Sequence, residues 1–252
     1  MISVIEVYNA VRELANKDQK GFVTPAVFNS FADVAQQNVF SEIFGNLVEA
    51  KALRMSQRDP GAAESIYRGV EDDLSEYISE SRLKSSRDPN LTGDSNLFKK
   101  PEDFYKLVSV RVDGDERTQV ELIYRPDQMS SVLSSNLSAP TELFPVALVS
   151  KNLEVFPTDI VSIIMTYYRY PSSRYPTNVM GSSKGDVDYS AAPRFSVGEI
   201  MTNGFYHPNI SDCRDFDLPE RFKGQVIAEI CKMIGVRLRD DVLAQFGQTQ
   251  TN

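Results

Sequence analysis

The segment FYKLVSVRV, residues 104–112, decides how this chain folds. Val108, Val110 and Val112 alternate with polar side chains, a period of two that predicts a half-buried β-strand. The stretch from Phe104 to Tyr170 is the only long part of the chain with a sheet-like pattern. We therefore expect the rest of the chain, which has the patterns of helices and loops, to be organised around it.

A hairpin is expected directly after this strand. Asp113-Gly114 indicates a tight turn, because type I′ turns need positive φ angles that glycine adopts freely. The return strand is expected at residues 119–124. One face of it is expected to carry Val120, Leu122 and Tyr124, with Glu121 on the other.

Two further segments extend the sheet. Residues 145–150 and 153–156 predict a second hairpin, and residues 161–170 form the run richest in β-branched and aromatic side chains. Only residues 126–135 have a helical pattern between these strands. We therefore predict an antiparallel sheet or small sandwich, and not a parallel βαβ topology.

Helices are predicted both before and after the sheet segment in the sequence. Apolar residues at helical spacing predict helices at residues 4–15, 25–55, 62–81, 219–234 and 239–246.

Three boundary residues support these helices. Thr24 is expected to cap the second helix, which begins at Pro25. Asp217 is expected to cap the helix that starts near residue 219, and Gly235 is expected to end it.

Residues 171–218 are the least regular part of the chain. A structureless loop of this length is unusual in a compact domain, and its aromatic content argues against simple disorder. We interpret it as an arm ordered by a neighbouring subunit, although residues 194–205 are also compatible with a strand. The candidates for a subunit interface are its aromatic residues Tyr175, Tyr189, Phe195, Phe205 and Tyr206.

The predicted elements define an α+β fold. An N-terminal helical segment and C-terminal helices are expected to pack around the antiparallel sheet or small sandwich, with a long loop or arm. The expected segments are an N-terminal helical region (1–96), a β domain (97–170), the loop or assembly arm (171–218), and C-terminal helices (219–252) that pack back on the helical region.

Composition narrows the classes of function. The chain has 252 residues and a formal net charge of −8 at pH 7, which weighs against a protein that grips nucleic acid through clustered lysine and arginine. Two isolated cysteines do not suggest a disulfide scaffold, and an intracellular site of synthesis fits. No apolar run is long enough for a membrane helix, and the first residues lack a signal-peptide pattern.

Catalytic and metal-binding motifs are weak. His207 is the single histidine and lies outside any nucleophile motif. The acidic pairs Asp113/Asp115, Asp186/Asp188 and Asp215/Asp217 are the remaining candidates for a metal or an acid–base site, but turns favour aspartate for backbone reasons. We expect no catalytic residue, metal or cofactor, and a metal-dependent hydrolase is the minor alternative.

The order of several segments carries a resemblance to a known family. These segments are residues 3–8, 15–25, 28–29, 139–142, 144–145, 153–157, 168–171, 211, 215–218 and 234–240. They include Asn16-Lys17-Asp18-Gln19-Lys20-Gly21 and Ala139-Pro140-Thr141-Glu142. In this order they resemble structural proteins of short-tailed bacteriophages, including the crAss-like group.

The resemblance implies a head–tail connector, or neck ring, protein of the virion that is made and assembled in the host cytoplasm. Such a protein forms a ring of about twelve copies below the portal. Its partners would be the portal protein and other neck or tail proteins, with genomic DNA passing through the channel and no membrane involved. The acidic charge suits a channel that DNA must not stick to. Another virion role, such as a tail tube or fibre adaptor, is the alternative.

Overall fold

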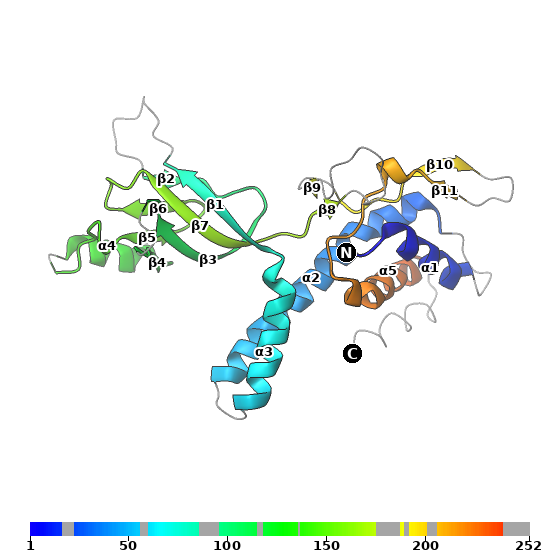
Figure 1. Ribbon diagram of the computed structural model, residues 1–252, viewed down its shortest axis with the longest axis horizontal. Helices are drawn as coiled ribbons and strands as arrows, with labels where there is room; N and C mark the ends of the chain where they lie inside the picture. Colours follow the sequence, from blue (N-terminus) through cyan, green and yellow to red (C-terminus); the bar gives the residue numbers. More distant parts are fainter. Residues whose placement is uncertain are drawn as a thin grey trace. The chain divides into compact units, whose positions relative to one another are not determined.

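The computed structural model describes residues 1–16, 23–55, 60–85, 96–114, 118–135, 137–174, 187–188, 192–200 and 206–238. The chain has an α+β fold, as predicted (Figure 1). It divides into two compact units. Met1–Ser75 and Pro171–Asn252 together form the first, here called the helical unit, and Glu76–Tyr170 forms the second, here called the sheet unit.

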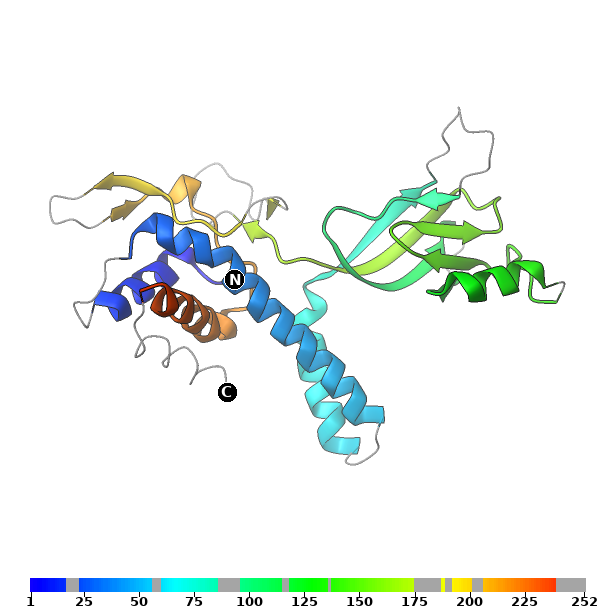
Figure 2. The same cartoon turned by 180° about the vertical axis from the view of Figure 1, so that it is seen from behind.

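Four α-helices dominate the helical unit. They are α1 (Val4–Asn16), α2 (Pro25–Met55), α3 (Pro60–Ser75) and α5 (Lys223–Leu238). Helix α2 packs against both α3 and α5, and α1 packs against α5 (Figure 2). The core is formed by their apolar stripes, which include Val7, Tyr8, Val11, Phe28, Val39, Phe40, Leu47, Val226, Ile230 and Ile234.

The start of α2 is as predicted. The hydroxyl oxygen of Thr24 accepts a hydrogen bond from the backbone N–H of Val27 at 3.3 Å, and Pro25 is the first helical residue. Thr24 thereby satisfies one of the N–H groups that a helix leaves without an internal partner.

The third helix ends earlier than predicted. It stops at Ser75, and residues 78–84 form strand β1 (Ile78–Lys84) instead of a last helical turn. Tertiary pairing overrides the helical pattern of these residues, because β1 pairs along its whole length with β7 (Ser162–Arg169). The carbonyl oxygen of Tyr77 also accepts a hydrogen bond from the backbone N–H of Arg169 at 2.8 Å.

The last described helix corrects two boundary predictions. Helix α5 continues through Gly235 to Leu238, so Gly235 does not end it. The side chain of Asp217 bonds to Ser172 and not to the start of the helix. A one-turn 3₁₀ helix, η2 (Glu220–Phe222), precedes α5 instead. The helix predicted at residues 239–246 lies outside the described residues.

The described parts of residues 171–218 are built into the helical unit. Two short antiparallel pairs occur there, β8 (Ser173–Arg174) with β9 (Val187–Asp188), and β10 (Val197–Ile200) with β11 (Tyr206–Pro208). The turn η1 (Ile210–Asp212) follows. The predicted alternative of a strand within 194–205 is therefore confirmed for residues 197–200. Several side chains of this segment belong to the core, namely Phe195, Cys213, Phe216 and Leu218.

The sheet unit is a small sandwich, one of the two architectures predicted. Its three-stranded antiparallel sheet has the order β1-β7-β3, with β3 at Phe104–Val112. Its four-stranded sheet has the order β2-β6-β5-β4 and is formed by β2 (Leu97–Phe98), β6 (Leu153–Phe156), β5 (Val146–Val149) and β4 (Glu121–Ile123). One core joins the two sheets and includes Phe98, Val110, Val120, Leu153, Val155, Ile163 and Met165.

One strand pair contradicts the prediction of purely antiparallel pairing. Strand β4 runs parallel to β5, and helix α4 (Pro126–Ser134) lies between them in sequence. This is a local βαβ arrangement, because a parallel pair needs a crossover connection and α4 is part of it. The predicted hairpin of β5 and β6 is confirmed.

The hairpin after β3 forms only next to its turn. Gly114 has a φ of 97°, as the turn prediction requires, and Val110 accepts a hydrogen bond from the N–H of Val120. Beyond this point β4 leaves β3, so Tyr124 is exposed and not on the buried face with Val120. Val108 is also exposed, because the pairing of β3 with β7 is irregular between Leu107 and Ser109 and shifts the alternation.

Candidate interaction site

The acidic pair of the helical unit has a structural role. The carboxylate of Asp215 accepts a hydrogen bond from the backbone N–H of Val4 at 2.9 Å, at the start of α1. Burial raises the pKa of Asp215 above its ordinary value, and this hydrogen bond opposes the rise. Asp217 accepts bonds from the N–H and the hydroxyl of Ser172 at 3.0 and 3.1 Å. Both side chains are buried and bound to the protein itself, so neither is open to a substrate.

The other two acidic pairs are only partly described. Asp113 accepts a hydrogen bond from the hydroxyl of Ser162 at 2.7 Å and forms an ion pair with Arg82 at 3.1 Å. Asp188 lies in β9, and Asp115 and Asp186 lie outside the described residues. In the described part of the chain, no three histidine, cysteine, aspartate or glutamate side chains are grouped to hold a metal ion.

The histidine and the cysteines offer no nucleophile pair. His207 is exposed in β11, and its Nδ1 lies 3.3 Å from the carbonyl oxygen of Pro208. Cys213 and Cys231 are buried free thiols. Burial raises the pKa of Cys213 and raises the pKa of Cys231 to about 12, so both are neutral thiols at pH 7.

Of the predicted interface aromatics, Phe195 and Tyr206 lie within the described residues. Phe195 is 2% exposed and stacks on Tyr8 with ring centroids 4.1 Å apart. The side-chain amide of Asn29 bonds both backbone groups of Phe195, at 2.8 and 2.9 Å. Phe195 is therefore a core residue of the chain itself and has no free surface for a neighbour. Tyr206 is half-buried in β11, whereas Tyr175, Tyr189 and Phe205 lie outside the described residues.

Among the described residues, the most exposed of the large apolar side chains lie elsewhere, in the loop between α4 and β5. Leu137, Leu143 and Phe144 are 100%, 74% and 76% exposed. The loop is held in shape, because Thr141 and Phe144 exchange two backbone hydrogen bonds at 3.0 and 3.3 Å. The next residue, Pro145, is buried. The structure therefore presents large apolar groups to solvent on an anchored turn.

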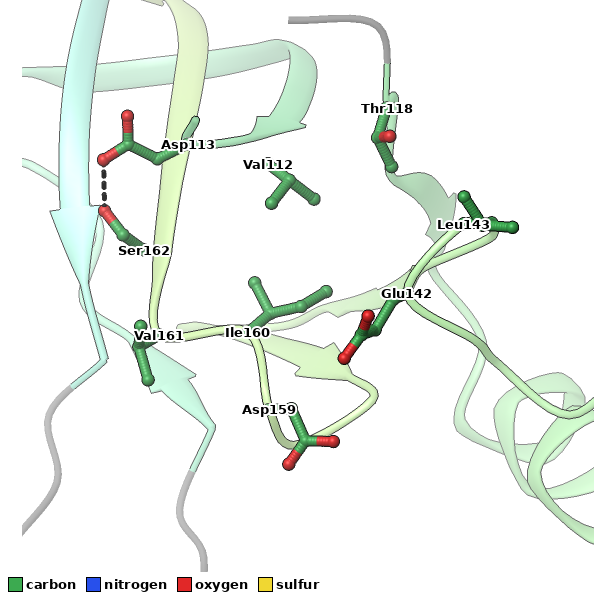
Figure 3. A pocket seen from close by; sticks show the side chains of 9 residues that line it. All are labelled: Val112, Asp113, Thr118, Glu142, Leu143, Asp159, Ile160, Val161 and Ser162. Atoms are coloured by element: carbon green, nitrogen blue, oxygen red, sulfur yellow. Dashed lines mark hydrogen bonds between the residues drawn. The ribbon is translucent and has the colours of Figure 1, made fainter. Parts of the chain in front are cut away.

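A hollow of about 340 Å³ lies beside this turn, and we call it the loop hollow. Its walls come from the end of β3 and its turn, from Thr118, from Glu142 and Leu143, from residues 159–161 between β6 and β7, and from Ser162 at the start of β7 (Figure 3). The side chain of Glu142 extends from its loop toward the segment that carries Asp159 and Ile160. All of these residues belong to the sheet unit, so a single folded unit forms the loop hollow.

Two carboxylates at the loop hollow have no partner among the residues that the structure describes. Asp113 is already bound by Ser162 and Arg82, and Figure 3 shows the bond to Ser162. Glu142 and Asp159 are exposed, and neither carboxylate forms an ion pair or hydrogen bond with the described residues. The wall therefore combines apolar surface with two uncompensated negative charges.

The polar face of the three-stranded sheet behaves differently. Arg111 bonds Glu80 across the sheet at 3.0 Å, and the hydroxyl of Thr166 donates to the same carboxylate at 3.3 Å. Arg82 neutralises Asp113 on that sheet. Charges that are paired within the fold are typical of an ordinary solvated surface, so this face is a weaker candidate for an interface than the loop hollow.

Sequence reasoning did not identify the loop hollow, although one signal was present. The stretch Thr141-Glu142-Leu143-Phe144 lies between Pro140 and Pro145, and it places two large apolar residues where a loop is expected. Such residues in a short loop next to proline are either buried under it or exposed for a partner. Only the structure distinguishes these cases.

Comparison with models of known protein families finds no match, and comparison with curated protein sequences finds no significant match. Across the segments that the structure describes, no helix combines the length and apolar character needed to cross a membrane.

Proposed function

We propose that the chain is a virion structural protein that forms a ring in the neck of a short-tailed bacteriophage, below the portal. In this role it extends the channel through which DNA passes and provides a docking surface for tail components. The kind of particle is suggested by the order of segments that resembles neck proteins. The observation that carries an assembly role is the exposed loop with Leu143 and Phe144.

An anchored apolar loop supports assembly for a physical reason. Exposed large apolar side chains lose contact with water when a partner covers them, and burial stabilises by about 25 cal/mol per Å² of apolar surface. Neighbouring exposed apolar groups on a protein surface commonly mark interaction sites. Leu143 and Phe144 are consecutive residues of the anchored turn, which gives the proposed contact more than one apolar anchor.

The charge of the chain supports a channel role. A net charge of −8 repels the phosphate backbone and so disfavours the contacts that would hold DNA in place. A ring built from identical subunits uses heterologous contacts that close by rotation.

Quantitative mass spectrometry of purified, intact particles of the encoding virus tests the proposal. A subunit of a neck ring in register with the portal should be present at a ratio near one chain per portal chain. A detectable chain at a much lower ratio would favour a fibre adaptor over a ring. Absence of the chain from the particles would refute the proposal.

A further inference from the structure

We propose that the loop hollow is a docking site for an extended segment of a different protein, which carries a lysine or arginine beside a large apolar side chain. The inference rests on the proposed function for the setting, in which the partner is another neck or tail protein. The chemistry of the partner follows from the described residues of the sheet unit alone.

The apolar part of the loop hollow defines an anchor. Val112 and Ile160 lie in its wall, and Ile160 is buried where the wall joins the sandwich core. Leu143 and Val161 also line it and are 74% and 57% exposed. A hollow of about 340 Å³ is at the small end of ligand pockets, so it accommodates a side chain or two and not a helix. An extended segment that inserts one large apolar side chain fits this size.

The carboxylates define the charge of the partner. Glu142 and Asp159 face the loop hollow without a cationic partner among the described residues. Lysine and arginine form charge-assisted hydrogen bonds with carboxylates, and such bonds are about twice as strong as neutral ones. Asp113 does not add to this attraction, because Arg82 already neutralises it. The loop hollow thus selects for a basic group next to an apolar one.

The same charges argue against a second copy of the chain as the occupant. A second copy would have to bring an unengaged lysine or arginine to Glu142 and Asp159, and the chain has 27 lysine and arginine residues against 35 aspartates and glutamates. On the sheet unit, Arg82 and Arg111 are already engaged with Asp113 and Glu80. A different, more basic protein matches the loop hollow better.

Selection from a random heptapeptide library on the purified full-length chain tests the proposal. We expect the enriched peptides to carry net positive charge and at least one large apolar residue. Binding of a synthetic enriched peptide should weaken by about tenfold in the double variant Glu142→Gln/Asp159→Asn, because two charge-assisted bonds are lost. The matched control is Glu102→Gln, an exposed glutamate of the sheet unit outside the loop hollow, and it should bind as the wild type does.

Three outcomes would overturn the proposal. They are enrichment of neutral or acidic peptides or of none, equal binding by the double variant and the wild type, and self-association of the wild type that Leu143→Glu, a change in the wall of the loop hollow, abolishes. The last outcome would identify a second copy as the occupant. Circular dichroism of each variant confirms that a loss of binding is not a loss of folding.

The selection separates this inference from the proposed function. It uses the isolated chain, so its result does not depend on whether the chain is part of a virus particle. A chain that is present in particles but selects no basic peptide would retain the proposed function and lose this inference. A chain that is absent from particles but still selects basic peptides would lose the proposed function and retain this inference.

Discussion

In the helical unit, Asp215 and Asp217 are 7% and 4% exposed and bind backbone groups of Val4 and Ser172. In the sheet unit, Glu142 and Asp159 are exposed beside the loop hollow and have no partner among the described residues. The chemical group is the same in both places. What the fold places next to a carboxylate therefore decides whether it is bound within the protein or left open to solvent.

Two phenylalanines show the same contrast. Phe195 of the helical unit is buried against Tyr8, whereas Phe144 of the sheet unit is 76% exposed. The helical unit uses its aromatic and acidic side chains to stabilise itself. The sheet unit exposes an aromatic side chain and two carboxylates to solvent at the turn and the loop hollow. The proposed contact is placed there for this reason.

The largest expected effect is on the stability of the helical unit. Phe195→Ala should lower the free energy of unfolding by about 3–5 kcal/mol, because it removes a buried aromatic ring and leaves a cavity. The matched control is Phe144→Ala, which should change it by less than about 0.5 kcal/mol because that ring is exposed. Urea denaturation of the purified variants measures both. Equal effects of the two substitutions would remove the contrast between the units.

A second prediction concerns the buried carboxylate of Asp217. Asp217→Ala should lower the free energy of unfolding by about 3 kcal/mol, because it leaves the buried N–H and hydroxyl of Ser172 without their acceptor. The control is Asp159→Ala, which should have an effect within about 0.5 kcal/mol. If thermal and urea unfolding show Asp217→Ala to be as stable as the control, its assignment as a structural residue is wrong.

The pH dependence of stability sharpens the comparison at Asp215. Burial raises its pKa in the folded protein, so the folded state binds this proton more tightly than the unfolded state does. The contribution of Asp215 to the free energy of unfolding should therefore fall as pH rises from the unfolded-state pKa, near 3.8, through the folded-state value, and then stay constant.

Asp215→Asn removes this titration and serves as the reference. The free energy of unfolding of the wild type minus that of the variant should decline across this interval. Urea denaturation at a series of pH values from about 3.5 to 7 measures the difference. A difference that stays constant, or that increases with pH, is incompatible with the raised pKa.

The smallest expected effect is that of the open carboxylates on stability. Glu142→Gln/Asp159→Asn should change the free energy of unfolding by less than about 0.5 kcal/mol, since neither side chain has a partner to lose within the described part of the chain. Thermal unfolding measured beside Glu102→Gln tests this expectation. A marked loss of stability would show that these carboxylates are structural, like those of the helical unit.

The sequence predicted the elements whose pattern is local. The alternation of Val110 and Val112, the turn at Gly114 and the cap at Thr24 depend on neighbouring residues, and all three are present in the structure. The α+β class followed from these elements.

Features that depend on distant partners were not predictable in the same way. Strand β1 continues the helical spacing of α3, and only its pairing with β7 makes it a strand. The parallel pairing of β4 with β5 likewise depends on how α4 reverses the chain.

The candidate site was the least predictable part. An aromatic-rich segment indicates that its rings are covered, but the sequence does not say whether the chain itself or a neighbour covers them. For Phe195 the cover is Tyr8 of the same chain. No described residue of the chain covers Leu143 and Phe144. The residue types alone do not indicate whether these side chains are buried or exposed.

The central claim is that the turn with Phe144 contacts another protein in the assembled particle. Photo-cross-linking tests it most directly, with a photoreactive phenylalanine analogue at position 144 and identification of the products by mass spectrometry. We expect cross-links from this position to a different protein of the particle that are absent from the free chain. Cross-links confined to the chain itself, identical in particles and in the free chain, would contradict it.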